Sequence, residues 1–303
     1  PIDDIVGNDI SDNRIGVWSK DSSLRITGGN TISSNDEYGL YIQGSYTTGT
    51  PLVAGNFIYL NDIAGVYLTG TPTVPPEIQA NEIYWNEYGI LAQSITGGIV
   101  SNSNNIYENI WGIYADSSTL TINGNIIREN HDGIYYGNSA IGTVKDNQVY
   151  GHAQVVYSKG PGGYLYGHME GYGIYLDSTA VFLSGNTLTD NLYGIYVLGG
   201  GPQIGGSLPE ERNTISYNLY PYPWGTAPHP IIVVSLGWGI AVDGSTNIQI
   251  LNNRISTNSR CIEIGGSTGT IDGNEIDMDP SAPEIYPRYY GIGYSVSSLT
   301  ISN

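Results

Sequence analysis

One motif returns along the whole chain and restricts what the chain can fold into. It reads Asn-x-Ile-x-x-Asn-x-x-Gly-Ile-Tyr, with clear copies at residues 81–90 and 125–135. The shortest repeats span about 21 residues. A unit this short cannot bury an apolar face alone, so successive units must stack on one another. The first Asn of each copy is Asn8, Asn30, Asn56, Asn81, Asn104, Asn125, Asn147, Asn186, Asn213, Asn253 and Asn274.

Within a unit the side chains alternate as they do in β-strands. Ile134 and Tyr136 fall on one face and Tyr135 on the other. Short strands bounded by Gly and Asn, without a 3.6-residue apolar period, argue against helices. We therefore predict an all-β chain that forms a right-handed parallel β-helix, with three short strands per coil and about 12 coils. The stacking predicts one domain over residues 1–303, as part of a longer chain or assembly.

Three recurring positions have expected structural roles. The second Asn of the motif, as in Asn86 and Asn130, is expected at a bend, because Asn tolerates left-handed backbone. Stacked coil on coil, such side chains can form amide ladders. The Gly that follows suits a tight corner or close packing. Cys261 replaces this Gly once and is expected to be a small buried side chain without a disulfide partner.

The repeat resembles the parallel β-helix repeats of the pectin-lyase-like superfamily, over residues 8–303. That group includes polysaccharide lyases, polygalacturonases, alginate epimerases, phage tailspikes, NosD-type periplasmic proteins and many surface proteins. The resemblance implies the fold and says little about activity, because the matching residues are scaffold residues.

Charge and composition exclude several classes of partner. The formal net charge is −18, so nucleic acids and anionic membranes are not expected to bind, and 10 Lys and Arg cannot line a dense basic groove for pectate or alginate. A single Cys excludes a disulfide framework, and no apolar run is long enough to insert into a bilayer. With 26 Tyr and 42 Gly, the composition favours an extracellular or cell-surface location.

Three insertions open between the second strand and the Gly corner, at about residues 153–171, 219–237 and 279–289. Equivalent positions in stacked coils lie on one side of a solenoid, and that side often binds a partner. Their aromatic residues suit sugar rings and protein interfaces alike. The alternative is that the inserts fold over each other and shield the flank. The candidate ligand-binding residues are Tyr157, Tyr164, Tyr166, His168, Tyr222, Trp224, Tyr286 and Tyr289.

A column of tyrosines is predicted beside the inward-facing Ile position, with Leu91 as an interruption. Coils about 4.8 Å apart would stack these rings. The column either stabilises the sheet or offers an aromatic platform to a glycan or another subunit. It stops at Ala241, Glu263 and Gly293. Its members are Tyr41, Tyr67, Tyr114, Tyr135, Tyr175 and Tyr196.

Acidic residues give weaker candidates for chemistry. Oxygen ligands for Ca²⁺ are available in two groups, Asp36 with Asp62 and Glu87, and Asp277 with Asp279; acidic residues on solvated turns are the commoner explanation of such groups. Glu108 and Glu129 take the same outward position in adjacent coils, a spacing that permits the carboxylate pair of glycoside hydrolysis, but stacked acids are also expected by chance in an acidic solenoid. No hydrolase, lyase or epimerase motif accompanies them.

Two hypotheses follow from the sequence. The first is a non-catalytic extracellular or cell-surface module, structural or adhesive, that contacts glycans or other surface protein subunits and associates end to end or laterally. The second is a carbohydrate-active enzyme, a hydrolase or lyase, or a carbohydrate-binding module that uses the aromatic inserts. The missing catalytic motifs favour the first. No cofactor is expected for either hypothesis, and Ca²⁺ is the one candidate ligand ion.

Overall fold

The computed structural model describes residues 4–45, 49–152, 154–159, 165–218, 220–224, 232–277, 290–295 and 297–302. For residues 154–159, 165–170, 220–224, 232–236 and 290, the backbone alone is described.

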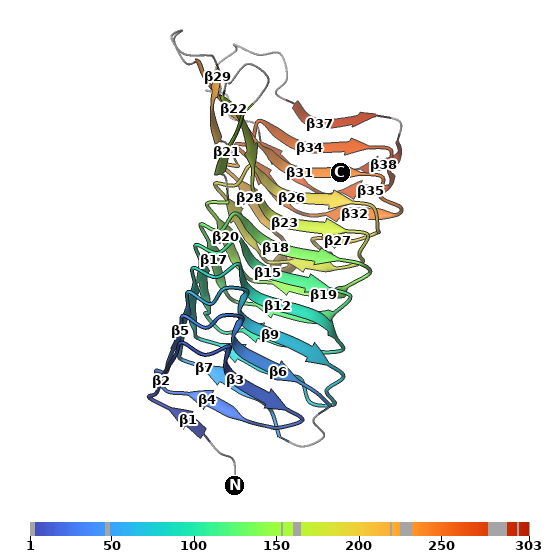
Figure 1. Ribbon diagram of the computed structural model, residues 1–303. Coiled ribbons are helices and arrows are strands. Elements are labelled where there is room, and N and C mark those ends of the chain that lie inside the picture. The colour runs from blue at the N-terminus through green and yellow to red at the C-terminus, as the bar shows by residue number, and fades with distance from the viewer. Residues whose placement is uncertain are drawn as a thin grey trace.

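Three long parallel sheets wrap into a β-helix, as the repeat predicted (Figure 1). Sheet A has 12 strands, and sheets B and C have 11 strands each. Each coil contributes one strand to A, then to B, then to C, and then climbs to the next coil. The register keeps equivalent residues aligned, as in Ile83 on Ile106 and Ile90 on Ile113. The predicted fold class is therefore confirmed.

Sheet A consists of β1 (Asp4–Val6), β4 (Arg25–Thr27), β7 (Leu52–Ala54), β10 (Glu77–Gln79), β13 (Ile99–Ser101), β16 (Thr119–Asn123), β19 (Ile141–Lys145), β24 (Phe182–Ser184), β27 (Gln203–Ile204), β32 (Ile248–Leu251), β35 (Thr268–Asp272) and β38 (Ser298–Ser302). Sheet B consists of β2 (Asp9–Ser11), β5 (Thr31–Ser33), β8 (Phe57–Tyr59), β11 (Glu82–Tyr84), β14 (Asn105–Tyr107), β17 (Ile126–Arg128), β20 (Gln148–Tyr150), β25 (Thr187–Thr189), β28 (Thr214–Ser216), β33 (Arg254–Ser256) and β36 (Glu275–Asp277). Sheet C consists of β3 (Ile15–Lys20), β6 (Tyr38–Gln43), β9 (Ala64–Gly70), β12 (Tyr88–Ile95), β15 (Trp111–Asp116), β18 (Asp132–Gly137), β23 (Tyr172–Asp177), β26 (Tyr193–Leu198), β31 (Trp238–Asp243), β34 (Arg260–Gly265) and β37 (Tyr290–Ser295).

The core is a column of apolar side chains enclosed by the three sheets. Ile78, Ile83 and Ile90 come from the three sheets of one coil, and none of them is exposed to solvent. Each such burial contributes roughly 1.5–3 kcal/mol relative to an exposed side chain. Because every coil adds the same set of residues, stacking more coils lengthens the core without widening it.

Two ladders of asparagine side chains run the length of the stack. At the bend between sheets A and B, the Nδ2 of Asn104 donates to the Oδ1 of Asn125 at 2.8 Å, and its Oδ1 accepts from the Nδ2 of Asn81 at 3.0 Å. This ladder is unbroken from Asn8 to Asn274. The buried amides satisfy backbone groups that the turn leaves without partners.

The second ladder corrects one expectation. At the bend between sheets B and C, the left-handed residue is the one before the Asn, with φ between 53° and 59°, and not the Asn itself. Most of these Asn side chains instead donate to the Asn of the next coil, as Asn86 does to Asn109 at 3.1 Å. The left-handed residues are Asp12, Ser34, Leu60, Trp85, Glu108, Glu129, Asp190, Tyr217 and Thr257.

The Gly of the motif serves close packing. A Cβ on Gly89 would lie 2.6 Å from the carbonyl oxygen of Gly112 in the next coil, and its φ is not in the left-handed region. Cys261 takes this position in one coil and is fully buried, as expected. Burial raises the pKa of its thiol to about 11, so the thiol stays protonated at neutral pH.

Two antiparallel hairpins leave the stack between sheets B and C (Figure 1). They are β21 (Gln154–Lys159) with β22 (Leu165–Glu170), and β29 (Tyr220–Trp224) with β30 (Ile232–Leu236). Both rise from the same flank of the stack, and the third predicted insertion, residues 279–289, lies outside the described residues. The described chain has one short 3₁₀ helix, η1 (Pro209–Glu211), and none of its helices could cross a membrane.

Candidate functional site

The outer face of sheet C carries the predicted tyrosine column. Tyr41 and Tyr67 lie in register in neighbouring strands, and Tyr114, Tyr135, Tyr175 and Tyr196 follow in order beyond Leu91. Trp18 extends the column at the first coil of sheet C. At the other end, Ala241 pairs with Tyr196, and Glu263 and Gly293 continue the register without a ring.

A second aromatic column stands beside the first, and the sequence reasoning missed it. Its members precede the motif Gly, three positions before the first column, so strict alternation assigns them to the opposite face. The strand departs from alternation at the Gly, and both columns share one surface: Tyr38 lies 4.9 Å from Tyr67 between ring centroids. The signal available in the sequence was an aromatic residue directly before Gly. The members are Tyr38, Tyr88, Trp111, Tyr172, Tyr193 and Trp238.

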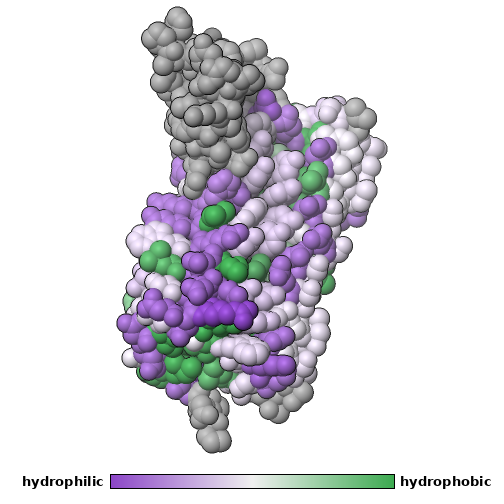
Figure 2. All heavy atoms as spheres, in the orientation of Figure 1, coloured by the Kyte–Doolittle hydropathy of each residue, from purple (hydrophilic) through white to green (hydrophobic). Residues whose placement is uncertain are grey.

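The rings of the two columns, which together we call the aromatic band, pack mainly on each other. Tyr114 and Tyr135 stack with centroids 4.4 Å apart and planes 17° apart, while Tyr135 and Tyr175 meet edge to face at 83°. Such pairs contribute roughly 0.5–1.5 kcal/mol each beyond the area they bury. Most of the band is half-buried, and in Figure 2 the front face of sheet C has mostly pale, intermediate hydropathy.

The hydroxyl groups of the band stay protonated at neutral pH. Burial raises the pKa of Tyr135, Tyr172 and Tyr193, and neighbouring tyrosines add to the shift. These phenols are therefore hydrogen-bonding groups at neutral pH and not general bases.

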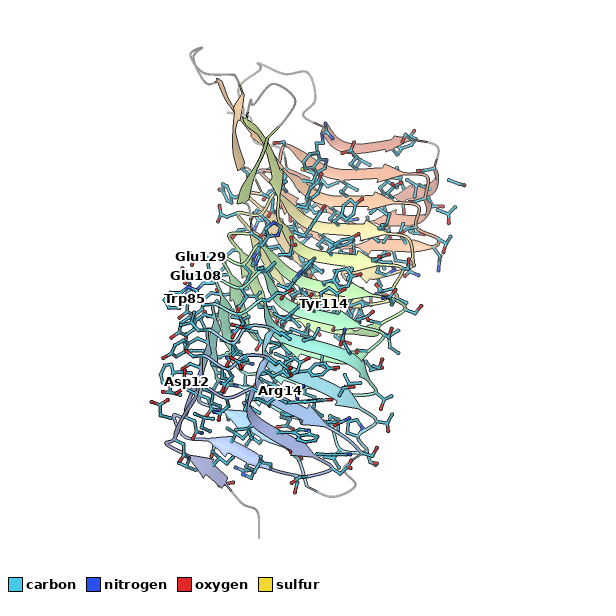
Figure 3. All side chains as sticks on the ribbon, viewed as in Figure 1. Asp12, Arg14, Trp85, Glu108, Tyr114 and Glu129 are labelled. Atoms are coloured by element: carbon cyan, nitrogen blue, oxygen red, sulfur yellow. The ribbon has the colours of Figure 1, made fainter. Side chains whose placement is uncertain are left out.

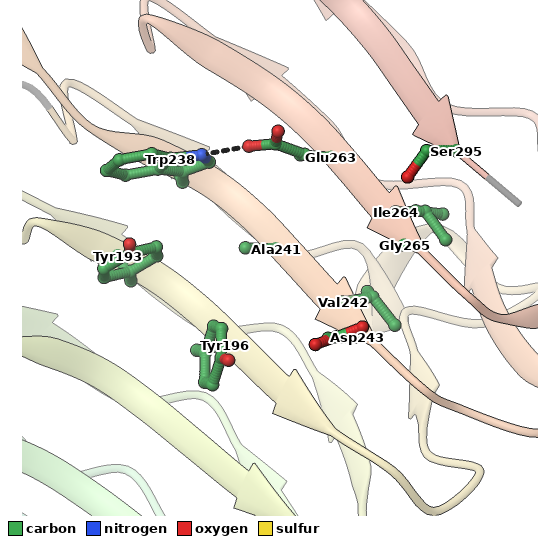
Figure 4. Close-up of a pocket in the computed structure, with 10 residues that line it drawn as sticks. All are labelled: Tyr193, Tyr196, Trp238, Ala241, Val242, Asp243, Glu263, Ile264, Gly265 and Ser295. Carbon is green, nitrogen blue, oxygen red and sulfur yellow. Dashed lines mark hydrogen bonds between the residues drawn. The ribbon is translucent and has the colours of Figure 1, made fainter.

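A hollow of about 260 Å³ opens where the first column loses its ring at Ala241. Tyr193, Tyr196 and Trp238 form one side, and the carboxylates of Asp243 and Glu263 lie on the other sides (Figure 4). The hollow exists because Ala241 has only a methyl group where the preceding coil has a Tyr.

Trp238 is held from three directions. Tyr193 stacks on one side with centroids 4.4 Å apart, and the guanidinium of Arg260 lies 4.8 Å from the indole ring centroid. The indole N–H donates to Glu263, which also accepts from Arg260 at 2.6 Å. The indole is thus oriented before any ligand arrives.

Carboxylates outnumber available cations beside the band. Among the described residues, Arg14 is bonded to Glu37 at 2.8 Å and Arg260 to Glu263, and Lys20 at the end of β3 is a further cation at the edge of this face. Asp116 and Asp177 lie two strands apart at the ends of β15 and β23, next to the tyrosines. The face therefore presents acceptors of hydrogen bonds and disfavours anionic ligands.

Sheet B has a separate aromatic stack. Tyr84 is stacked between Tyr59 and Tyr107, each 4.9 Å away between centroids, and Trp85 meets its edge. Trp85 is 52% exposed and Leu60 47%, in adjacent coils at the bend between sheets B and C. This bend also carries Glu108 and Glu129 (Figure 3).

The predicted carboxylate pair lies apart from the hollow. The backbone N–H of Glu108 donates to the carbonyl of Glu129 at 3.2 Å, so the two residues are neighbours, as predicted. Glu129 is ion-paired with Arg128, whose guanidinium lies 4.2 Å from the ring centroid of Tyr107. Figure 3 places both glutamates on the flank, away from Tyr114 on sheet C.

The structure describes the remaining candidate residues only in part. Tyr164, Tyr286, Tyr289 and Asp279 lie outside the described residues, and Tyr157, Tyr166, His168, Tyr222 and Trp224 lie on hairpin strands of which the backbone alone is described. Asp36, Asp62 and Glu87 are exposed. Within the described part of the chain, no three His, Cys, Asp or Glu side chains come close enough to hold a metal ion.

A family model for the right-handed β-helix region matches residues 4–168 and 166–303. The chain belongs to the right-handed β-helix family. Among solved structures, it is similar to the periplasmic alginate epimerase AlgG, with 12% identity and a TM-score of 0.46, over 98% of this chain and 76% of that one. A point mutant of AlgG gives 14% identity and a TM-score of 0.46, over 93% of this chain and 73% of that one. No curated protein sequence matches this β-helix chain. Likeness of this degree says nothing about activity.

Proposed function

We propose that this β-helix protein is a non-catalytic extracellular module that binds neutral polysaccharides along the outer face of sheet C. The observation that carries the proposal is the aromatic band, which runs from Trp18 on β3 to Trp238 on β31 and ends at the hollow beside Ala241. The stack of Tyr59, Tyr84 and Tyr107 on sheet B is shorter than the band.

The chemistry of the band suits sugars better than apolar partners. A pyranose ring has an apolar C–H face and a rim of hydroxyl groups, and Tyr and Trp offer an apolar ring with a polar tip. Gln43, Gln93 and Asp177 border the band and accept hydrogen bonds from hydroxyl groups. The carboxylates and the pairing of the arginines favour neutral polymers over uronates.

The positions and partners of the carboxylates support a non-catalytic role: the predicted pair does not lie on the band, and Glu263 beside the hollow is already bonded to Arg260 and to the indole of Trp238. Glu108 and Glu129 lie on the flank, and Glu129 is paired with Arg128. Hydrolysis needs two carboxyl groups on opposite sides of one bound sugar. A glycan on the aromatic band would not lie between these two glutamates.

A second candidate function is lateral contact with another surface protein. Phe57, Leu60 and Trp85 are 48%, 47% and 52% exposed on consecutive coils at the edge of sheet B. Apolar side chains clustered in this way often mark protein interfaces. Light scattering at increasing concentration tests this candidate: Trp85→Ser should weaken any self-association that is seen.

Titration calorimetry with glucans, mannans, galactans and xylans, and with pectate and alginate, tests glycan binding. We expect a neutral polymer to bind and the two uronate polymers to bind at least about tenfold more weakly. A double variant with Trp111→Ala and Tyr175→Ala should lose about tenfold in affinity, since two aromatic contacts contribute roughly 1–3 kcal/mol together.

The matched control is Tyr84→Ala on sheet B, which removes an equally stacked ring from the other face. Its affinity should equal that of the wild type. Absence of binding to every neutral polymer, or equal losses in the sheet B and sheet C variants, would overturn the proposal.

A further inference from the structure

The first column of the aromatic band lacks a ring at Leu91, within the column, and at Ala241, where the column ends, and the two places differ in what fills them. Leu91 pairs with Tyr67 and Tyr114 and fills its position with a branched side chain that is 5% exposed. Ala241 pairs with Tyr196 and leaves the hollow of about 260 Å³. A missing ring therefore leaves usable space at Ala241 and not at Leu91.

We propose that the gap at Ala241 is a binding subsite for a single neutral pyranose ring, which takes the place of the missing aromatic ring. This inference rests on the proposed function, because the ring would be the terminal residue of a glycan lying along the aromatic band. Elsewhere in the column a ring packs against the ring of the next coil, either stacked, as Tyr114 is on Tyr135, or edge to face, as Tyr135 is on Tyr175. In the coil after Tyr196 the corresponding residue is Ala241, which has only a methyl group, so the sugar ring packs against Tyr196 in place of an aromatic ring.

The volume of the hollow and the residues that line it both fit one sugar ring. Pockets for drug-sized ligands enclose roughly 300–1,000 Å³, and this hollow is smaller. One side is aromatic, and the opposite sides hold Asp243, Glu263 and the hydroxyl of Ser295. A sugar ring can pack its apolar face on the aromatic side and donate hydrogen bonds from its hydroxyl groups to the polar side chains.

The two carboxylates decide the class of ring. Hydroxyl groups of a sugar donate to carboxylate oxygens, whereas an aromatic side chain of a protein partner would cover these carboxylates without giving them a donor. Arg260 compensates the charge of Glu263, so a uronate would place a second uncompensated negative charge beside Asp243. Trp238, held by Tyr193, Arg260 and Glu263, gives the ring a wall that needs no ordering on binding.

The experiment uses the full chain and three probes, the methyl glycosides of glucose, galactose and mannose, with glucuronate and phenol as comparison ligands. Binding is measured by saturation-transfer NMR and by titration. We expect at least one methyl glycoside to bind, and Ala241→Tyr, which fills the gap with the ring of the column, to weaken that binding at least about tenfold. Asp243→Ala, at an exposed position, should weaken it by about threefold or more without affecting the fold.

The matched control is Leu91→Tyr, which supplies the ring that the column lacks between Tyr67 and Tyr114. It should leave glycoside binding unchanged, and Ala241→Tyr should retain polymer binding along the band. If no methyl glycoside binds, or if phenol binds in its place, or if Ala241→Tyr and Leu91→Tyr behave alike, the subsite is refuted. Those results leave the proposed function standing when neutral polymers still bind, whereas loss of all polymer binding refutes the proposed function itself.

Discussion

His152 is the one residue that interrupts the second asparagine ladder between Asn130 and Asn191. Its side chain is fully buried, and its two ring nitrogens lie 3.1 Å from the carbonyl oxygens of Asn130 and Ile127. A neutral imidazole has a single N–H, so one of these contacts sets an oxygen against a bare nitrogen. Burial lowers the pKa of His152, and the two carbonyls oppose that shift in part.

We therefore expect His152 to make the folded protein less stable as the pH falls. The unfolded chain takes up the proton first, near pH 6.5, because the folded pKa is lower. The stability that neutral His152 contributes is complete above that pH and is lost as the pH falls toward the folded pKa. His152→Asn restores the ladder residue, so its Tm should fall less between pH 7.5 and 5 than that of the wild type, by thermal denaturation followed by circular dichroism.

The difference between the two proteins should be constant above pH 7.5, where the imidazole is neutral in both states. Parallel Tm curves for wild type and variant across the whole range would show that His152 does not titrate on unfolding.

The sequence predicted the inward Ile residues and the repeating Asn because both recur with a fixed spacing. It did not predict which bend residue is left-handed. Trp85 and Leu60 have no local preference for that conformation, and they adopt it because the following Asn must reach the next coil. That constraint comes from stacking, so no single repeat contains it.

At the scale of the elements, each ladder ties its bend to the strand before it and to the neighbouring coils. The Nδ2 of Asn104 donates to the carbonyls of Ile78 and Ser101 at 2.9 Å each, in addition to its bond with Asn125. Removing this side chain leaves several buried groups without partners, each costing roughly 1–3 kcal/mol. We expect Asn104→Ala to lower the free energy of unfolding by about 2–4 kcal/mol in urea titrations.

Asn123 provides a control in the neighbouring coil. It lies at the end of β16 and is half-exposed, so Asn123→Ala should change the free energy of unfolding by less than about 0.5 kcal/mol. Equal losses in the two variants would contradict a special role for the ladder.

Sheet C shows why only half of the aromatic band was predictable. Alternation correctly separates Ile113 from Tyr114, but it fails across the Gly before Ile113, and so Trp111 joins Tyr114 on the outside. The Gly packs against the next coil and changes the direction of the strand. The hollow was not predictable either, because it depends on four neighbouring strands and on the small size of Ala241.

At the scale of the molecule, charge is spread along an elongated stack. The formal net charge is −18, from 28 acidic and 10 basic residues. The ion pairs that the structure describes are mostly at the surface, as in Arg25 with Asp4 at 3.1 Å, where each side chain is more than a third exposed. Such pairs contribute about 0–1 kcal/mol each, so repulsion among the unpaired carboxylates should outweigh them.

Salt should therefore stabilise this protein. Raising NaCl from about 10 mM to about 150 mM shortens the Debye length from about 30 Å to about 8 Å. Carboxylates several coils apart then repel each other much less. We expect the Tm to rise by about 2 °C or more, and KCl at the same ionic strength should give the same rise, because screening does not depend on the cation. A larger rise in CaCl₂ than ionic strength explains would indicate a cation bound between carboxylates. A fall in Tm with NaCl would mean that the surface ion pairs outweigh the net charge, and that the acidic residues repel each other less than their number suggests.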